Sequence, residues 1–326
     1  MKVSVVMATY NGAAYVQEQI DSILTNERPP DELIVVDDGS TDGTLEVLHA
    51  VAAMNSSLRV VVLCNERNIG ASLTFVRALL GSTGDVVLFA DQDDRWHANK
   101  IGVLLKCFTD HPGLLMAYSD GSITNAALQP DGRSIFSTRN KSHLALGAAR
   151  DAQEIAANPD IKGCTMALDG AFARRLFGES DPAFARYWGH DHWAALFALG
   201  LGPVDVVQEP LLLHRFHGGN SSGAVRFNPF SASQRRQYVS RARAQESDHF
   251  VMRYRLAIAQ ARRFGPLFAP TLLEALGVLL RLSEQRRDLR SMGPWHRLRA
   301  ALEVLRSGAY HKHYNGAYTF LRDLLF

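Results

Sequence analysis

The chain has 326 residues, of which 47% are hydrophobic and 21% charged, a composition typical of a globular protein and incompatible with a disordered one. Its formal net charge of +2 conceals an uneven distribution. Residues 1–230 carry 18 Lys and Arg against 26 Asp and Glu, whereas residues 231–326 carry 17 against 7. We therefore expect two regions, 1–230 and 231–326, with different tasks.

We expect neither an export signal nor a membrane-spanning segment in this sequence. Cys64, Cys107 and Cys164 match neither a disulfide framework nor a zinc site. The apolar stretch Val3–Ala8 is too short for a signal sequence, and runs such as Leu276–Leu280 end well before the roughly 20 residues of a membrane-spanning helix. We expect a cytoplasmic protein that does not span the membrane, with peripheral contact at its inner face left open.

Four short apolar runs alternate with amphipathic segments in the first hundred residues. The runs predict strands buried on both faces, and the segments between them predict helices. This order predicts an α/β fold, a doubly wound, mainly parallel sheet with helices on both faces. The strands expected are Val3–Ala8, Leu33–Val36, Arg59–Leu63 and Val86–Ala90, and the helices begin near Val16, Thr44, Ser72 and Ile101.

Polar clusters follow each predicted strand, where a ligand of such a sheet binds. They are Thr9–Gly12, Asp37–Ser40, Asn65–Gly70 and Asp91–Asp94. No glycine-rich dinucleotide or phosphate-binding loop occurs. Alternate carboxylates in the last cluster suit Mg²⁺ or Mn²⁺ bridging to a diphosphate. An acidic turn that caps the next helix is the simpler structural alternative.

Taken together, these clusters resemble family 2 glycosyltransferases of the GT-A fold. The resemblance is carried by SVVMATYNG (4–12), LIVVDDGSTDGT (33–44), NERNIGAS (65–72) and FADQDDRW (89–96). The form ADQDD followed by Trp96 is most similar to bacterial rhamnosyltransferases. The resemblance implies a GT-A-like catalytic domain over 1–230, followed by a basic helical region over 231–326.

The resemblance also implies roles for individual residues. The positions that hold the nucleotide base and ribose correspond to Thr9, Tyr10, Asn11 and Asp38. Asp91 and Asp93 match the two ends of the Asp-x-Asp motif, with Asp91 contacting ribose or metal and Asp93 coordinating the metal. The role of Asp94 stays open.

Downstream, Lys162–Leu168 resembles the acceptor-side floor of the family, and a helix opens at His190. Inverting sugar transfer needs a base that accepts the proton of the attacking hydroxyl. Asp191 occupies the family's position for this base, and helix capping is the alternative. We expect His190 and His192 to flank the acceptor site.

The segment Leu211–Asn220 ends an apolar strand in a basic, glycine-rich loop. It resembles the Tyr-Arg-x-His-Gly-x-Asn stretch of the rhamnosyltransferase-like members, with His214 in place of Tyr. Arg215 is then a donor to the diphosphate, and His217 a third metal ligand, with an ordinary loop histidine as the alternative.

The last region is basic and helical. Arginine pairs recur among leucines, as in an interfacial helix, a protein-docking surface or a solvated helix face. We favour attraction to an anionic membrane surface, and the acidic first region argues against nucleic acid as partner. The pairs are Arg235–Arg236, Arg262–Arg263 and Arg286–Arg287.

The sequence thus predicts a metal-dependent, inverting glycosyltransferase. Its expected partners are a nucleoside-diphosphate sugar, with dTDP-rhamnose as one candidate, and a glycan or lipid-linked glycan acceptor in bacterial surface polysaccharide (O-antigen) synthesis. Self-association as a homo-oligomer is a further option. The rival readings are a metal-dependent phosphohydrolase that uses the Asp and His clusters, and a non-catalytic binding module.

Overall fold

The computed structural model describes residues 1–55, 58–138, 152–159, 161–217, 232–289 and 292–306. The chain divides into two compact units, Met1–Arg150 with Asp160–Gly223, and Asp151–Pro159 with Ala224–Phe326. The expected limit at residues 230 and 231 lies outside the described residues. The short segment 151–159 joins the second unit, although it precedes much of the first.

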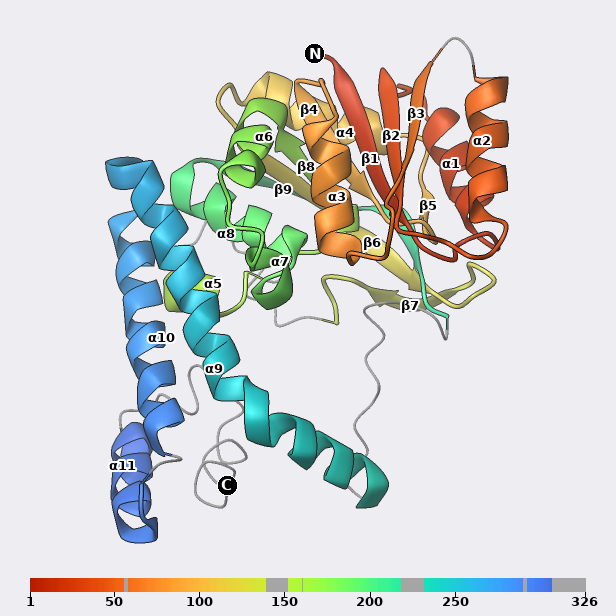
Figure 1. Cartoon of the computed structure of the whole chain (residues 1–326). Helices are drawn as coiled ribbons and strands as arrows, with labels where there is room; N and C mark the ends of the chain where they lie inside the picture. The colour runs from red at the N-terminus through yellow and green to blue at the C-terminus, as the bar shows by residue number, and fades with distance from the viewer. Residues whose placement is uncertain (56–57, 139–151, 160, 218–231, 290–291, 307–326) are drawn as a thin grey trace. The chain divides into compact units, whose positions relative to one another are not determined.

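One mixed β-sheet forms the centre of the first unit (Figure 1). Its strand order is β3-β2-β1-β4-β8-β6-β9-β5, and β7 pairs with β6. The first four strands run parallel, as expected, so their carboxyl ends meet at one edge. They are β1 (Val3–Thr9), β2 (Glu32–Asp37), β3 (Arg59–Cys64) and β4 (Val86–Ala90).

Helices cover both faces of this sheet, which confirms the predicted layering (Figure 1). Successive side chains of a strand point to opposite faces. Val3, Val5 and Met7 of β1 accordingly pack with α1 (Val16–Leu24), α2 (Thr44–Met54) and α4 (Lys100–Asp110) in one apolar core. On the other face lie α3 (Ala71–Leu80), α6 (Gly170–Gly178) and α8 (His190–Leu201), which contact one another.

The second half of the sheet departs from a simple parallel pattern. After β5 (Arg95–Trp96) and β6 (Met116–Thr124), β8 (Met166–Asp169) inserts between β4 and β6 and is antiparallel to both. β9 (Val204–Arg215) is parallel to β6 and antiparallel to β5. Residues 130–134 form β7 (Pro130–Ser134), which pairs with β6. This arrangement brings the start of β8 and the end of β9 beside the acidic cluster after β4.

The second unit is helical, as expected from its sequence. It consists of α5 (Ala152–Ala157), α9 (Ala232–Phe264), α10 (Pro270–Leu289) and α11 (Pro294–Arg306). α10 packs on both α9 and α5, and its buried residues include Leu272, Leu276 and Leu279. None of the helices in the described ranges combines the length and apolarity needed to cross a bilayer.

Candidate active site

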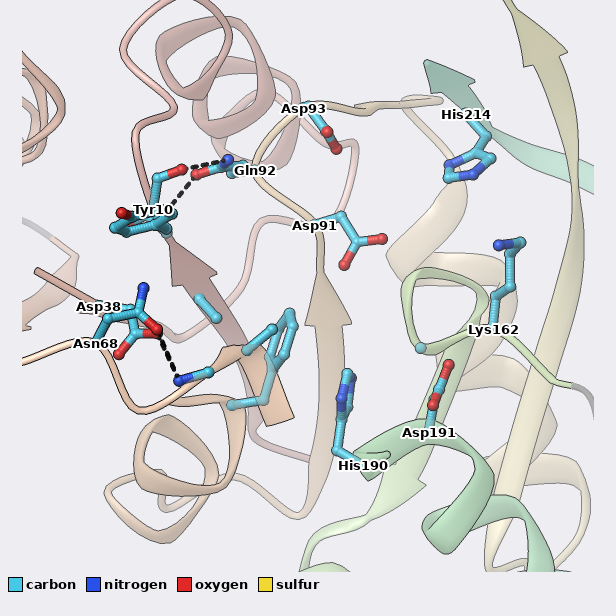
Figure 2. A pocket seen from close by; sticks show the side chains of 16 residues that line it. Tyr10, Asp38, Asn68, Asp91, Gln92, Asp93, Lys162, His190, Asp191 and His214 are labelled. Atoms are coloured by element: carbon cyan, nitrogen blue, oxygen red, sulfur yellow. Dashed lines mark hydrogen bonds between the residues drawn. The ribbon is translucent and has the colours of Figure 1, made fainter. Parts of the chain in front are cut away.

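A cavity of about 400 Å³ lies at the carboxyl edge of the parallel strands (Figure 2). It is the place that the doubly wound topology predicts for a ligand. The ends of β1, β2, β4 and β9, the start of α3, the 162–163 loop and the start of α8 all contribute to its wall. Its lining includes the predicted residues Thr9, Tyr10, Asp38, Asp91, Asp93 and Asp191, together with Asn68, Gln92, Lys162, His190 and His214.

The ends of β1 and β4 are joined by a side-chain amide. Gln92 Oε1 accepts a hydrogen bond from the Tyr10 backbone N–H at 2.9 Å, and Gln92 Nε2 donates to the Tyr10 carbonyl at 3.1 Å (Figure 2). A Cβ added at Gly12 would lie 2.2 Å from Gln92 Oε1, so this contact needs a residue without a side chain. The pair fixes the Tyr10 main chain, while the Tyr10 side chain remains 47% exposed.

Two of the expected nucleotide-binding residues hold neighbouring loops. Asn11 adopts a left-handed φ of 47°, and its Oδ1 accepts from the Thr41 N–H at 2.8 Å. Asn11 is not among the residues that line the cavity. Asp38 does line it, but its carboxylate already accepts from Asn65 Nδ2 and from the backbone N–H groups of residues 69 and 70, at 2.7 to 2.8 Å. Contact of these residues with a nucleotide stays a prediction.

Asp91 and Asp93 occupy the cavity wall just after β4 (Figure 2). Burial, followed by the charges of Asp94 and Asp93, raises the pKa of Asp91 to about 7. Burial and Asp94 also raise the pKa of Asp93, although the hydrogen bond from His217 opposes this. His217 Nε2 lies 2.9 Å from Asp93 Oδ2. The site therefore holds crowded negative charge that its own cations do not fully balance.

The third carboxylate, Asp94, has a different environment. It is fully buried, and its Oδ1 lies 2.9 Å from His214 Nδ1 and accepts from the Arg215 N–H at 3.1 Å. Burial would raise the pKa of Asp94, but the charge and hydrogen bond of His214 lower it. Lys100 adds a buried positive charge nearby, and its Nζ donates to the Cys164 carbonyl at 2.5 Å. Protein cations thus balance Asp94, which ties β9 to the acidic turn.

Arg215 is placed behind the cavity wall. Its side chain is 5% exposed, and it is not among the residues that line the cavity. Its Nε donates to the Asp93 carbonyl at 2.7 Å, Nη1 donates to the Ala126 carbonyl at 2.7 Å, and Nη2 pairs with Glu18 at 2.5 Å. These contacts position the main chain of Asp93, whereas we had expected Arg215 to contact the diphosphate.

Asp191 lies in the first turn of α8 and lines the same cavity. Burial would raise the pKa of this carboxyl, but the charges of His190 and His192 lower it below its usual range. The His192 N–H also donates to Asp191 Oδ1 at 2.8 Å. The carboxylate is therefore ionised at neutral pH and able to accept a proton. The structure brings it into one cavity with Asp91 and Asp93, although it lies 98 positions after Asp93 in the chain.

Sequence reasoning missed the ammonium group of Lys162, which enters the cavity from the loop before β8 (Figure 2). In the sequence, Lys162 is only the first residue of the segment that resembles the acceptor-side floor. No local motif marks this lysine, because its proximity to the acidic cluster results from the insertion of β8 beside β4. Gln92 was likewise treated as the variable position of Asp-x-Asp.

The donor groups at this edge fit a divalent cation. Asp91 and Asp93 supply carboxylate oxygens, and His217 supplies an imidazole nitrogen next to Asp93, a set that suits Mn²⁺ or Mg²⁺. Asp91, Asp94, Cys164 and His214 also have potential ligand atoms within 4.8 Å of one another. One buried atom of this group, Asp94 Oδ2, has no hydrogen-bond partner. Electrostatic crowding at Asp91 would be relieved by a cation.

We expect two carboxylates of this cluster to affect stability in opposite directions in metal-free protein. Asp94→Ala removes the acceptor for His214 and should lower the free energy of unfolding by about 3 kcal/mol. Asp91→Asn should raise it by about 1–2 kcal/mol at pH 8, since a raised pKa makes the ionised carboxylate costly once the pH exceeds the unfolded value. At pH 4 the second effect should nearly vanish. Urea unfolding with a chelator present measures both, and changes of equal sign at pH 8 would contradict this assignment.

Comparison with known proteins matches the first unit to one family. The model described as Glycosyl transferase family 2 matches residues 4–149. Over 99 residues the chain is 37% identical to the putative teichuronic acid biosynthesis glycosyltransferase TuaG of Bacillus subtilis. That alignment covers 30% of this chain and 38% of TuaG, so the chain spans well under two thirds of that relative.

Solved structures with the same fold include two glycosyltransferases. S. aureus TarS 1–349, in complex with UDP, has a TM-score of 0.55 at 18% identity, covering 88% of this chain and 72% of that chain. The mannosyltransferase PcManGT from Pyrobaculum calidifontis, in complex with GDP-Man and Mn²⁺, has a TM-score of 0.52 at 20% identity, covering 99% of this chain and 83% of that chain. The likeness of the first unit to these structures identifies its fold as GT-A, and residues 4–149 match the family model of glycosyl transferase family 2.

Proposed function

We propose that this protein transfers a sugar, with inversion, from a nucleoside-diphosphate sugar to a hydroxyl group of a glycan or lipid-linked glycan in bacterial surface polysaccharide synthesis. The observation that carries the proposal is one cavity lined by both Asp-x-Asp carboxylates and by Asp191. A transferase needs a site for the donor diphosphate next to a base for the acceptor hydroxyl, because the acceptor attacks the carbon that the diphosphate leaves.

In this proposal the nucleoside occupies the β1 and β2 side of the cavity. Thr9, Tyr10 and Asp38 line that side, while Asn11 acts indirectly by holding the Thr41 main chain. The diphosphate then lies toward Asp91 and Asp93. Arg215 is a positioning residue in this arrangement, since its guanidinium fixes the Asp93 carbonyl.

We assign Asp93, His217 and Asp91 as the residues that hold Mg²⁺ or Mn²⁺. A bound divalent ion supplies positive charge to the diphosphate and makes it a better leaving group. The solved PcManGT complex contains Mn²⁺ with its nucleotide sugar, which supports divalent-metal use in this fold. The Asp93–His217 contact at 2.9 Å places a carboxylate and an imidazole together for this purpose.

Asp191 is the proposed general base. Its carboxylate accepts the acceptor hydroxyl proton as the oxygen attacks the anomeric carbon from the side opposite the leaving diphosphate. Because Asp191 has a lowered pKa, it is available in its ionised form throughout the neutral range. Its base strength is modest, so the proton transfers mainly as the new bond to the oxygen forms.

The phosphohydrolase alternative finds less support in the positions of the histidines. His217 contacts Asp93, His214 contacts Asp94, and the His190 ring stacks on Phe75 with centroids 4.3 Å apart. They belong to three separate environments. The similarity of the acidic turn to rhamnosyltransferases makes dTDP-rhamnose the first donor to test.

We further propose that the basic second unit attaches the enzyme to anionic lipid, where a lipid-linked acceptor would be found. Residues 231–326 carry ten more positive than negative side chains. In α11, Trp295 is 82% exposed beside exposed Arg299, a combination that suits a membrane interface.

The donor proposal predicts metal-dependent binding of a nucleoside diphosphate. Among UDP, dTDP and GDP, one should raise the melting temperature by several degrees with Mn²⁺ and by much less with a chelator. The difference should be larger at pH 8 than at pH 5.5, because metal binding requires Asp91, with its pKa of about 7, to lose its proton. Equal thermal shifts with and without Mn²⁺ would refute the metal assignment.

The base proposal predicts a selective loss of turnover. Asp191→Asn should lower kcat by about 10² to 10⁴-fold while the affinity for the nucleoside diphosphate changes less than about twofold, because the substitution removes only the proton acceptor. Asp110→Asn, at the exposed end of α4, is the matched control and should retain full activity. Wild-type turnover by Asp191→Asn would exclude this residue as the base.

The membrane proposal predicts charge-dependent vesicle binding. Arg262 and Arg263 are exposed on α9, and each arginine near an anionic surface contributes about 1 kcal/mol. The double substitution Arg262→Gln with Arg263→Gln should weaken sedimentation with phosphatidylglycerol vesicles by about tenfold or more. Arg175→Gln, exposed in the first unit, serves as control. Equal binding to neutral phosphatidylcholine vesicles would argue against an electrostatic attachment.

A further inference from the structure

Lys162 places a positive charge in the cavity. Among the described residues, its Nζ makes no hydrogen bond or ion pair. A lysine surrounded by carboxylates ordinarily pairs with one of them. Here the ammonium group acts on Asp91 and on Asp191 only through its electrostatic field, which partly opposes the raised pKa of Asp91 and adds to the lowered pKa of Asp191.

The backbone that presents this side chain is firmly held. The Lys162 carbonyl accepts from the Thr165 N–H at 3.0 Å and from Thr165 Oγ1 at 2.7 Å. Ile161 on one side and Gly163 and Cys164 on the other are buried. The stem of Lys162 is therefore anchored at its Cα, and only the side chain projects into the cavity. The point from which the side chain starts is fixed, while its flexible stem lets the ammonium group adjust to a ligand.

Lys162 lines the cavity between Asp91, where we propose the diphosphate of the donor, and Asp191, the proposed base for the acceptor hydroxyl. In Figure 2 its side chain rises from the loop beside Asp191 toward His214, across from the carboxylate of Asp91. A diphosphate near Asp91 would bring negative charge to a wall that already carries Asp91 and Asp93. Among the described residues that line this cavity, Lys162 is the one with a lysine or arginine side chain.

From this geometry, and resting on the proposed function, we propose that the Lys162 ammonium binds the diphosphate of the nucleotide and stabilises it as it departs. In the transfer step, a bond forms between the acceptor oxygen and the anomeric carbon, and the bond from that carbon to the terminal phosphate oxygen breaks. The electron pair of the broken bond stays on the phosphate, and the acceptor proton moves to Asp191. The leaving group gains one negative charge, which Lys162 receives by a charge-assisted hydrogen bond.

Binding of nucleotides without turnover tests this assignment. Calorimetry with saturating Mn²⁺ measures the affinity for the nucleoside diphosphate. Lys162→Met should lower this affinity by about 10- to 100-fold, which is the contribution of a hydrogen bond between a charged pair. The affinity for the matching nucleoside monophosphate, which lacks the terminal phosphate, should fall by less than about threefold. Lys162→Arg keeps the charge and should recover most of the lost affinity.

Controls separate the possible roles of this lysine. Lys106→Met removes an exposed lysine of α4 and should leave both affinities unchanged. Equal losses for diphosphate and monophosphate in Lys162→Met would overturn the proposal, since they indicate a general effect on the cavity. An unchanged diphosphate affinity would overturn it as well. Failure of the wild-type protein to bind any nucleoside diphosphate would instead refute the proposed function itself.

Discussion

The arrangement of this site depends on how the carboxylates of Asp91, Asp93 and Asp94 are kept close together despite their mutual repulsion. Asp94 is the member that the protein neutralises internally, through His214 and the nearby Lys100. That contact joins the turn after β4 to the end of β9. Asp91 and Asp93 stay at the cavity wall, where burial and the neighbouring carboxylates raise the pKa of each. One carboxylate thus provides stability, and its two neighbours retain the electrostatic cost that a cation can relieve.

The supporting contacts around the cavity follow the same division. Arg215 has a side chain suited to bind phosphate, yet its donors go to the Asp93 and Ala126 carbonyls and to Glu18. The carboxylate oxygens of Asp38 likewise accept hydrogen bonds from the loop before α3. Charged groups beside the cavity thereby become rigid supports. Lys162, by contrast, remains available for a ligand because its backbone alone is fastened.

The first four strands and their helices could be predicted closely from the sequence, because buried parallel strands produce short valine-rich runs with polar ends. The same reasoning located Asp91 and Asp93, whereas Asp191 was assigned from the family resemblance, and the structure brings all three into one cavity. The insertion of antiparallel β8 could not be predicted, since its pairing depends on strands distant in the chain. For that reason Lys162 was missed. The inward or outward direction of Arg215 also has no local signal, because tertiary contacts decide it.

The paired hydrogen bonds between Gln92 and Tyr10 give the middle residue of the Asp-x-Asp motif a main-chain function. The parallel ladder between β1 and β4 ends with Met7 and Ala90, and the Gln92 amide then presents one donor and one acceptor to Tyr10 as a peptide group would. The sheet is in effect one rung longer than its backbone. A glutamate at position 92 would have nearly the same shape but no donor for the Tyr10 carbonyl. The main-chain contact therefore favours glutamine over glutamate at this position, independently of any contact with a ligand.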